Sequence, residues 1–156
     1  MKNKERLLKR VAEVYQCLEE QINKNVSSNE SCTACGRCCC FTDFDHSLFV
    51  SSPEIIYFHE KVGPEIRLMV AKQCPYNVNG KCMIYENRFA GCRIFFCRAD
   101  VDFQNQLSES TLKKFKDICL EFKIPYRYMD LQKALNEDLT NICRSAGEQP
   151  AAGHSI

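Results

Sequence analysis

The residues best suited to chemistry in this 156-residue chain are its 12 cysteines, nine of which lie between Cys32 and Cys97. Such a density has two common explanations: a disulfide scaffold in a secreted protein, or thiolate ligands for a metal inside the cell. A signal peptide needs an uninterrupted apolar run after its basic start, and here Lys9, Arg10 and Glu13 interrupt it. We therefore expect a cytoplasmic protein whose thiols are free to bind metal.

The first cluster, Cys32-x-x-Cys35-x-x-Cys38, has the spacing of a metal-binding loop. Two intervening residues let the chain curl so that successive thiolates converge on one centre, with backbone N–H groups directed at the sulfurs. Gly36 permits the tight or left-handed backbone that such a loop often needs. The spacing therefore predicts that these three cysteines are metal ligands.

A second segment supplies Cys74, Cys82, Cys92 and Cys97. A bacterial ferredoxin has its fourth cysteine where this chain has Thr42, so a ferredoxin assignment fails. Cys74 is a candidate for the fourth ligand instead, because a proline follows it, as a proline follows the fourth cysteine in the ferredoxin pattern. Together the two segments furnish eight ligands. That number suits two tetrathiolate sites, or one cluster plus other thiols.

The remaining cysteines and the histidines are expected to have other roles. Cys38, Cys39 and Cys40 are consecutive, and because neighbouring side chains diverge, at least one of them should face another centre or the core; the role of Cys40 stays open. The residues expected to be buried, inert thiols on or beside apolar helical stripes are Cys17, Cys119 and Cys143. The residues expected to lie outside any ligand set are His46, His59 and His154.

The chain resembles the CxxCxxCC family of zinc- or iron-chelating proteins, also described as iron–sulfur cysteine-cluster proteins. The matching motifs are Cys32-x-x-Cys35-Gly36-x-Cys38-Cys39, Cys74-Pro75-Tyr76, Gly80-Lys81-Cys82-Met83-Ile84-Tyr85-Glu86-Asn87-Arg88, Cys92-Arg93-Ile94-Phe95 and Cys97. The resemblance implies that the metal ligands are Cys32, Cys35, Cys38, Cys39, Cys74, Cys82, Cys92 and Cys97. Two departures are Cys40, which lies outside the pattern, and Phe89, which stands where the family usually has proline.

Two arginines, Arg88 and Arg93, lie between the expected ligands. A cluster with four thiolates carries net negative charge, so either guanidinium can donate hydrogen bonds to sulfur from outside the ligand set. The alternative is an ordinary pairing of Arg88 with Glu86 at the surface. We expect both arginines to assist in binding the cofactor.

Three functions are compatible with these residues. The leading one is an iron–sulfur protein, with a 4Fe–4S cluster, that acts in electron transfer or as an accessory factor. The second is a structural Zn²⁺ protein whose function is to bind another protein. The third is an enzyme, because some relatives with this cysteine pattern are flagellin lysine N-methylases, although those chains are much longer and no glycine-rich cofactor loop is present here. Soft thiolates suit zinc and iron–sulfur clusters equally, so the metal stays undecided.

Helices are expected on either side of the cysteine segments. Apolar residues at three- and four-residue steps predict a helix over 3–25. Ser52 as N-cap and Pro53 predict a second helix that ends at Gly63, while 65–72 is either a short helix or a strand. Asn77–Gly80 has the composition of a hairpin turn.

After the cysteines, Ser108 is expected to cap a helix over Ser110–Phe122, which Pro125 ends. A last helix is indicated by Leu131, Ala134, Leu135, Leu139 and Ile142. These elements predict a mainly α fold with at most a short β-hairpin. One small domain is expected over 1–146, and a flexible tail over 147–156. In the domain, an N-terminal helix (3–25) and C-terminal helices (108–143) should pack around an irregular cysteine-rich metal-binding core (32–97).

The composition limits the partners. The net charge is +1, so nothing favours a nucleic acid or an acidic membrane surface as a partner. No stretch approaches the roughly 18 apolar residues that a membrane span needs. A protein partner of unknown identity stays compatible with the sequence.

Overall fold

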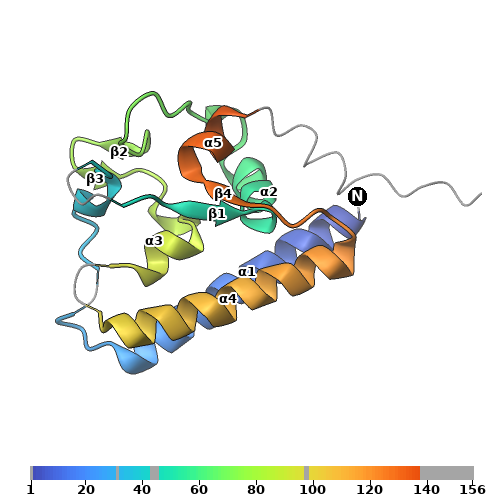
Figure 1. Ribbon diagram of the computed structural model, residues 1–156, viewed down its shortest axis with the longest axis horizontal. Coiled ribbons are helices and arrows are strands. Elements are labelled where there is room, and N and C mark those ends of the chain that lie inside the picture. The colour runs from blue at the N-terminus through green and yellow to red at the C-terminus, as the bar shows by residue number, and fades with distance from the viewer. Residues whose placement is uncertain (1, 31, 43–45, 97–98, 138–156) are drawn as a thin grey trace, which may run out of the picture.

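The computed structural model describes residues 2–30, 32–42, 46–96 and 99–137, and the fold of this part is mainly helical, as predicted (Figure 1). Two long helices, α1 (Lys2–Asn25) and α4 (Val101–Phe122), pack side by side in opposite directions. The shorter α2 (Ser52–Val62) and α3 (Ala90–Ile94) pack against both of them. We call α1, α2 and α4 the helical part.

Helix α1 confirms the stripe that its sequence predicts. Its buried residues are Leu7, Val11, Val14, Tyr15, Leu18 and Ile22. They face α4, where Phe115 and Ile118 are fully buried, and α2, where Ile55 and Phe58 are buried. Burial of such side chains contributes roughly 1.5–3 kcal/mol each, so apolar packing is sufficient to hold these helices together.

Helix α2 begins one residue earlier than predicted. Its N-cap is Ser51 rather than Ser52, because Glu54 sits at the third helical position after Ser51 and completes a capping box. Glu54 Oε2 accepts hydrogen bonds from the Ser51 backbone N–H (2.8 Å) and the Ser51 hydroxyl (2.7 Å). Glu54 Oε1 accepts one from the N–H of Ala90, the first residue of α3, at 2.7 Å. One buried carboxylate therefore satisfies the N-termini of two helices. Gly63 ends α2 as expected.

Helix α4 is longer than predicted. It begins at Val101 and its N-cap is Asp100, whose Oδ1 accepts a hydrogen bond from the Phe103 N–H at 2.9 Å, so the prediction of Ser108 as the cap is wrong. The added turns contain Gln104, a polar residue that is nevertheless buried. Its Nε2 donates to the carbonyls of Ile94 and Phe96 at 2.9 and 3.0 Å, a tertiary role that periodicity does not show. The end at Phe122 agrees with the prediction.

Two short antiparallel ladders complete the described fold. The expected hairpin is present as β2 (Asn77–Val78) and β3 (Lys81–Cys82). The second ladder, which we did not predict, joins β1 (Phe49–Ser51) to β4 (Tyr128–Asp130), with Val50 opposite Met129. It places β4, which directly precedes the last described helix, beside the start of α2 (Figure 1).

The last described helix, α5 (Leu131–Asn136), includes three of the five apolar residues that predicted it; Leu139 and Ile142 lie outside the described residues, as does the tail over 147–156. The sequence predicts a short helix or a strand over 65–72. However, Glu65 ends the short 3-10 turn η2 (Gly63–Glu65), and residues 66–72 form neither a helix nor a strand. No helix in the described ranges is long and apolar enough to cross a membrane.

Candidate metal centre

The first cysteine segment, residues 32–42, folds as an irregular loop around one helical turn. Gly36 has φ +69°, in the left-handed region, and precedes the 3-10 turn η1 (Arg37–Cys39). The Cys39 N–H donates to the Gly36 carbonyl at 3.2 Å, and the Cys40 N–H donates to the Arg37 carbonyl at 3.1 Å. At the start of the loop, the Ala34 N–H donates to Cys32 Sγ at 3.4 Å. This contact is of the N–H to sulfur type that the spacing predicts.

The second segment pairs with the first through its backbone. The Cys74 N–H donates to the Cys39 carbonyl at 2.9 Å, and the Phe41 N–H donates to the Lys72 carbonyl at 3.0 Å. These bonds flank an isolated antiparallel bridge between Cys40 and Gln73. We call the unit formed by residues 32–42 and 72–96 the cysteine lobe. The pairing brings together two cysteine segments that are more than thirty positions apart in the chain.

The hairpin β2–β3 closes on the first loop at Gly36. Asn77 Nδ2 donates to the Gly36 carbonyl at 2.8 Å. A Cβ at position 36 would lie 2.8 Å from the Gly80 carbonyl oxygen, closer than such atoms approach in proteins. Gly36 is therefore required both by its positive φ and by the contact with the hairpin turn, a second reason that the motif alone does not reveal.

The pKa values of two thiols in the first segment respond to neighbouring thiols: Cys38 to Cys39, and Cys39 to Cys38 and Cys74. The interaction with Cys39, followed by burial, raises the pKa of the Cys38 thiol far above its usual value. At Cys39 the interaction with Cys38 lowers the pKa, but the interaction with Cys74 and burial outweigh it and raise the pKa to about 12. The Cys39 thiol of the first segment therefore lies near Cys74 of the second.

Two further thiols lie within electrostatic reach of Cys39. Cys82, at the end of β3, contributes to the raised pKa of Cys39. Cys92, on α3, has a pKa raised first by burial and then by Cys39 and Cys38. The short helix α3, whose first N–H group donates to Glu54, thus carries a thiol within electrostatic reach of the first loop. Five of the predicted ligands are gathered in this way: Cys38, Cys39, Cys74, Cys82 and Cys92.

The buried Arg88 connects Cys32 to the same group. Its Nη1 donates to Cys32 Sγ at 3.9 Å, a long contact that the size of sulfur permits, and its guanidinium lies 3.7 Å from the centre of the Tyr85 ring. The positive charge of Arg88 also favours the ionised forms of Cys38 and Cys92, against the larger effects that raise their pKa values. Arg88 therefore donates to one sulfur of the predicted ligand set and lies within electrostatic reach of two others.

Arg93 has a different role from Arg88. It donates to the carbonyls of Arg88 (2.9 Å) and Glu86 (2.8 Å) and forms an ion pair with Glu19 of α1 at 2.6 Å. Its guanidinium also lies 4.5 Å from the centre of the Tyr15 ring. Arg93 thus holds the cysteine lobe to α1 instead of reaching a sulfur. Sequence reasoning missed Glu19, because a glutamate at the edge of an apolar stripe resembles any solvent-facing residue.

The other predicted residues lie apart. Cys35 is exposed at the tip of the first loop, Cys97 lies outside the described residues, and Cys143 does too. Cys119 is buried in the core as expected, with its pKa raised by burial to about 11, whereas Cys17, expected to be buried, is only partly so. Phe89, in place of the family's proline, is buried with its ring 4.8 Å from that of Phe58.

The donor set is chemically suited to a soft metal. Thiolates are the ligands of zinc and of iron–sulfur clusters, and an arginine beside them offsets their charge. Within the described ranges, no group of three or more His, Cys, Asp or Glu side chains is placed so that it could hold a metal ion.

Comparisons of the chain with family models, with curated proteins and with solved structures returned no match. The resemblance to the CxxCxxCC family therefore rests on the order and spacing of the cysteines.

Proposed function

We propose that this protein holds an iron–sulfur cluster, of the 4Fe–4S type, in its cysteine lobe and acts in electron transfer or as an accessory factor. The observation that carries the proposal is the convergence of thiols from two distant segments around one buried arginine. The pKa of Cys39 responds to Cys38 and Cys74, and the pKa of Cys92, on α3, is raised by burial and then by Cys39 and Cys38. Metal binding ionises thiols, and the Arg88 guanidinium, which lies 4.0 Å from Glu19, would then stand beside negatively charged sulfur as well.

The surroundings of the thiols favour a redox centre. Arg88 is buried, while Cys35, in the same loop as Cys38, is exposed. Electron transfer needs one accessible edge, and hydrogen bonds to sulfur adjust the potential of a cluster. A bound cluster supplies one-electron chemistry. The chain's own contribution is to enclose one face of it, to place the Arg88 guanidinium beside sulfur, and to leave the face at Cys35 open.

A structural zinc site is the second candidate, and the way the lobe is held together favours it. The two cysteine segments meet mainly through backbone hydrogen bonds and the contact of Gly36 with the hairpin. A zinc ion bound by four thiolates adds folding free energy to a segment of this kind. The lobe then serves as a rigid surface for a protein partner.

Metal analysis of anaerobically purified protein tests both candidates. We expect a brown protein that contains iron and acid-labile sulfide in equal amounts, and we expect Cys39→Ser and Cys92→Ser to lose most of both. Cys119→Ser is the matched control, since it removes a buried thiol from the helical part, and its iron content should equal that of the wild type. A colourless protein with stoichiometric zinc decides for the structural site. Equal metal content in all four proteins contradicts both candidates.

A further inference from the structure

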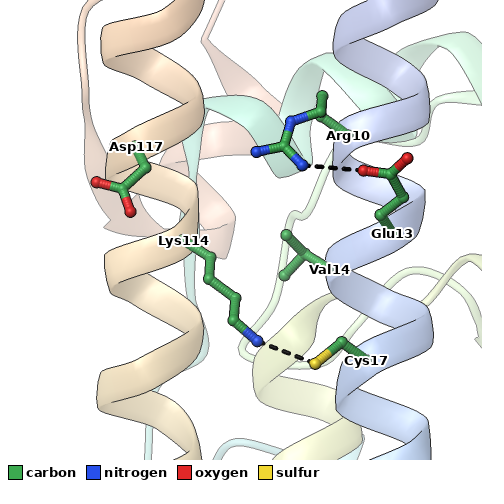
Figure 2. A pocket seen from close by; sticks show the side chains of 6 residues that line it. All are labelled: Arg10, Glu13, Val14, Cys17, Lys114 and Asp117. Atoms are coloured by element: carbon green, nitrogen blue, oxygen red, sulfur yellow. Dashed lines mark hydrogen bonds and ion pairs between the residues drawn. The ribbon is translucent and has the colours of Figure 1, made fainter.

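A second group of reactive side chains lies away from the cysteine lobe, in the groove between α1 and α4 (Figure 2). The groove contains a cavity of about 250 Å³, and the residues that line it are Arg10, Glu13, Val14, Cys17, Lys114 and Asp117. Lys114 reaches from α4 toward α1, and its Nζ donates to Cys17 Sγ at 3.0 Å. A nucleophilic amine and an oxidisable thiol from two helices therefore touch inside a cavity.

We propose that Cys17 and Lys114 form an oxidative modification site, in which hydrogen peroxide oxidises the thiol and the lysine amine captures the product as a covalent S–N link between α1 and α4. Peroxide is small and polar, and the cavity admits it to a partly exposed sulfur. Cys119, also in the helical part, is only 3% exposed and is shielded from the same reagent. The difference in access makes Cys17 the oxidisable thiol of the helical part.

The chemistry proceeds in two steps that balance. In the first, the Cys17 sulfur attacks one oxygen of hydrogen peroxide; the O–O bond breaks, an S–O bond forms, and the peroxide is reduced as the sulfur is oxidised to sulfenic acid with release of water. In the second, the Lys114 amine, after giving a proton to solvent, attacks the sulfur with its lone pair. The S–O bond breaks as the S–N bond forms, and the leaving hydroxide takes one of the two protons on that nitrogen to form water, while the other proton stays on the sulfenamide nitrogen. Sulfenic acids condense with nitrogen in this way to give sulfenamides, which thiols reduce.

The neighbouring charges direct Lys114 to the sulfur. Glu13 is paired with Arg10 at 2.9 Å (Figure 2), so the carboxylate that α1 contributes to the cavity lining is already occupied. Arg10 also donates to Glu121 at 3.1 Å. The two helices are held in register by buried residues on both sides of the contact, including Val11 and Phe115. A fixed distance between the helices keeps the amine beside the sulfur for as long as the sulfenic acid lasts.

Peptide mass spectrometry of the full-length protein after graded exposure to hydrogen peroxide tests the proposal. We expect a linked pair of peptides, one with Cys17 and one with Lys114, lighter than their sum by one hydrogen molecule and separated again by dithiothreitol. Lys114→Arg keeps the cation and the donor but removes the amine, so it should lose nearly all of this product while Cys17 continues to sulfinic acid. Lys113→Arg, the matched control on the adjacent position, should leave the yield unchanged. The proposal is overturned if the link forms equally in Lys114→Arg, if Cys17 in the wild type oxidises without forming it, or if Cys17 resists peroxide as Cys119 does.

Discussion

The helical part and the cysteine lobe are stabilised by different interactions. Between α1, α2 and α4, the contacts are aliphatic and aromatic side chains that are almost completely buried, such as Val11, Ile55 and Phe115. In the cysteine lobe, the contacts include backbone pairings and the close approach of Gly36 to the hairpin, beside buried apolar residues such as Tyr76, Phe89 and Ile94. The packing of the helical part needs no ligand, whereas a metal bound as we propose would add folding free energy to the irregular cysteine loops. We therefore expect the two regions to respond differently to mutation and to metal removal.

The largest expected effect is in the helical part. Phe115→Ala removes a fully buried ring and should lower the free energy of unfolding by about 3–5 kcal/mol, through lost burial and the cavity that remains. Urea unfolding measures this change, and the metal content per folded molecule should stay the same. Leu120→Ala, on the exposed face of the same helix, is the control and should change stability by less than about 0.5 kcal/mol. Loss of metal in folded Phe115→Ala protein would show that the two regions are not separable in this way.

A smaller effect is expected in the cysteine lobe at Gly36. Gly36→Ala forces a side chain into the left-handed region and against the Gly80 carbonyl, so it should cost about 2–3 kcal/mol. The loss should be largest in the lobe, seen as faster release of metal and faster labelling of its thiols. Gly80→Ala is the matched control, because it shares the positive φ but its Cβ meets only the Cys35 carbonyl at 4.0 Å. Equal rates of metal release in Gly36→Ala and Gly80→Ala would show that the contact between position 36 and the Gly80 carbonyl does not stabilise the lobe.

The ion pair between the regions should have a more modest effect. Glu19→Gln removes the carboxylate that pairs with Arg93 and faces Arg88 at 4.0 Å, and should lower stability by about 1 kcal/mol. A double-mutant cycle with Arg93→Met isolates the coupling between α1 and the lobe. A coupling energy indistinguishable from zero would mean that the lobe docks on α1 by apolar contacts alone.

The smallest expected effect is a pH dependence from His59 on α2. Burial lowers the pKa of His59, and its Nε2 is buried with no hydrogen-bond partner among the described residues. Because the unfolded chain then binds a proton more readily, with a pKa of about 6.5, stability should fall as the pH drops below about 6.5. Between about pH 7.5 and about pH 5.5, the free energy of unfolding of His59→Gln should therefore fall by a few tenths of a kcal/mol less than that of the wild type. Parallel stability curves for the two proteins, measured by urea unfolding, would exclude a contribution from His59.

The parts of the fold that were predictable are those set by local patterns. The period of Leu7, Val11 and Leu18 specifies α1, and the Asn-Gly dipeptide specifies the hairpin. The cap of α2 was misplaced by one residue because adjacent serines are equivalent until the position of Glu54 is taken into account. The early start of α4 and the β1–β4 ladder depend on tertiary contacts, of Gln104 and of Val50, that no local period encodes.

In the candidate site, the spacing of the cysteines and the family resemblance named Cys38, Cys39, Cys74, Cys82 and Cys92, whose thiols lie within electrostatic reach of one another; their role as metal ligands stays a prediction. The spacing did not distinguish Arg88, which reaches sulfur, from Arg93, which reaches Glu19, because both follow the same motif and only the packing of α3 on α1 separates them. The reactive position of Cys17 was missed for a similar reason: its partner, Lys114, lies on a different helix almost a hundred positions later.

The β1–β4 ladder has a consequence for the timing of biosynthesis. Phe49–Ser51 pairs with Tyr128–Asp130, so this pairing waits until nearly all of the described chain has left the ribosome. The cysteine lobe, which ends at residue 96, emerges before α4 exists, and α1 is then without its longest neighbour. Because a ribosome adds roughly 5–20 residues each second, the thiols spend an interval of seconds in a nascent chain whose helical part is still open. Chaperones or metal donors that meet the protein at that stage would find the lobe at its most accessible, before the closing strand arrives.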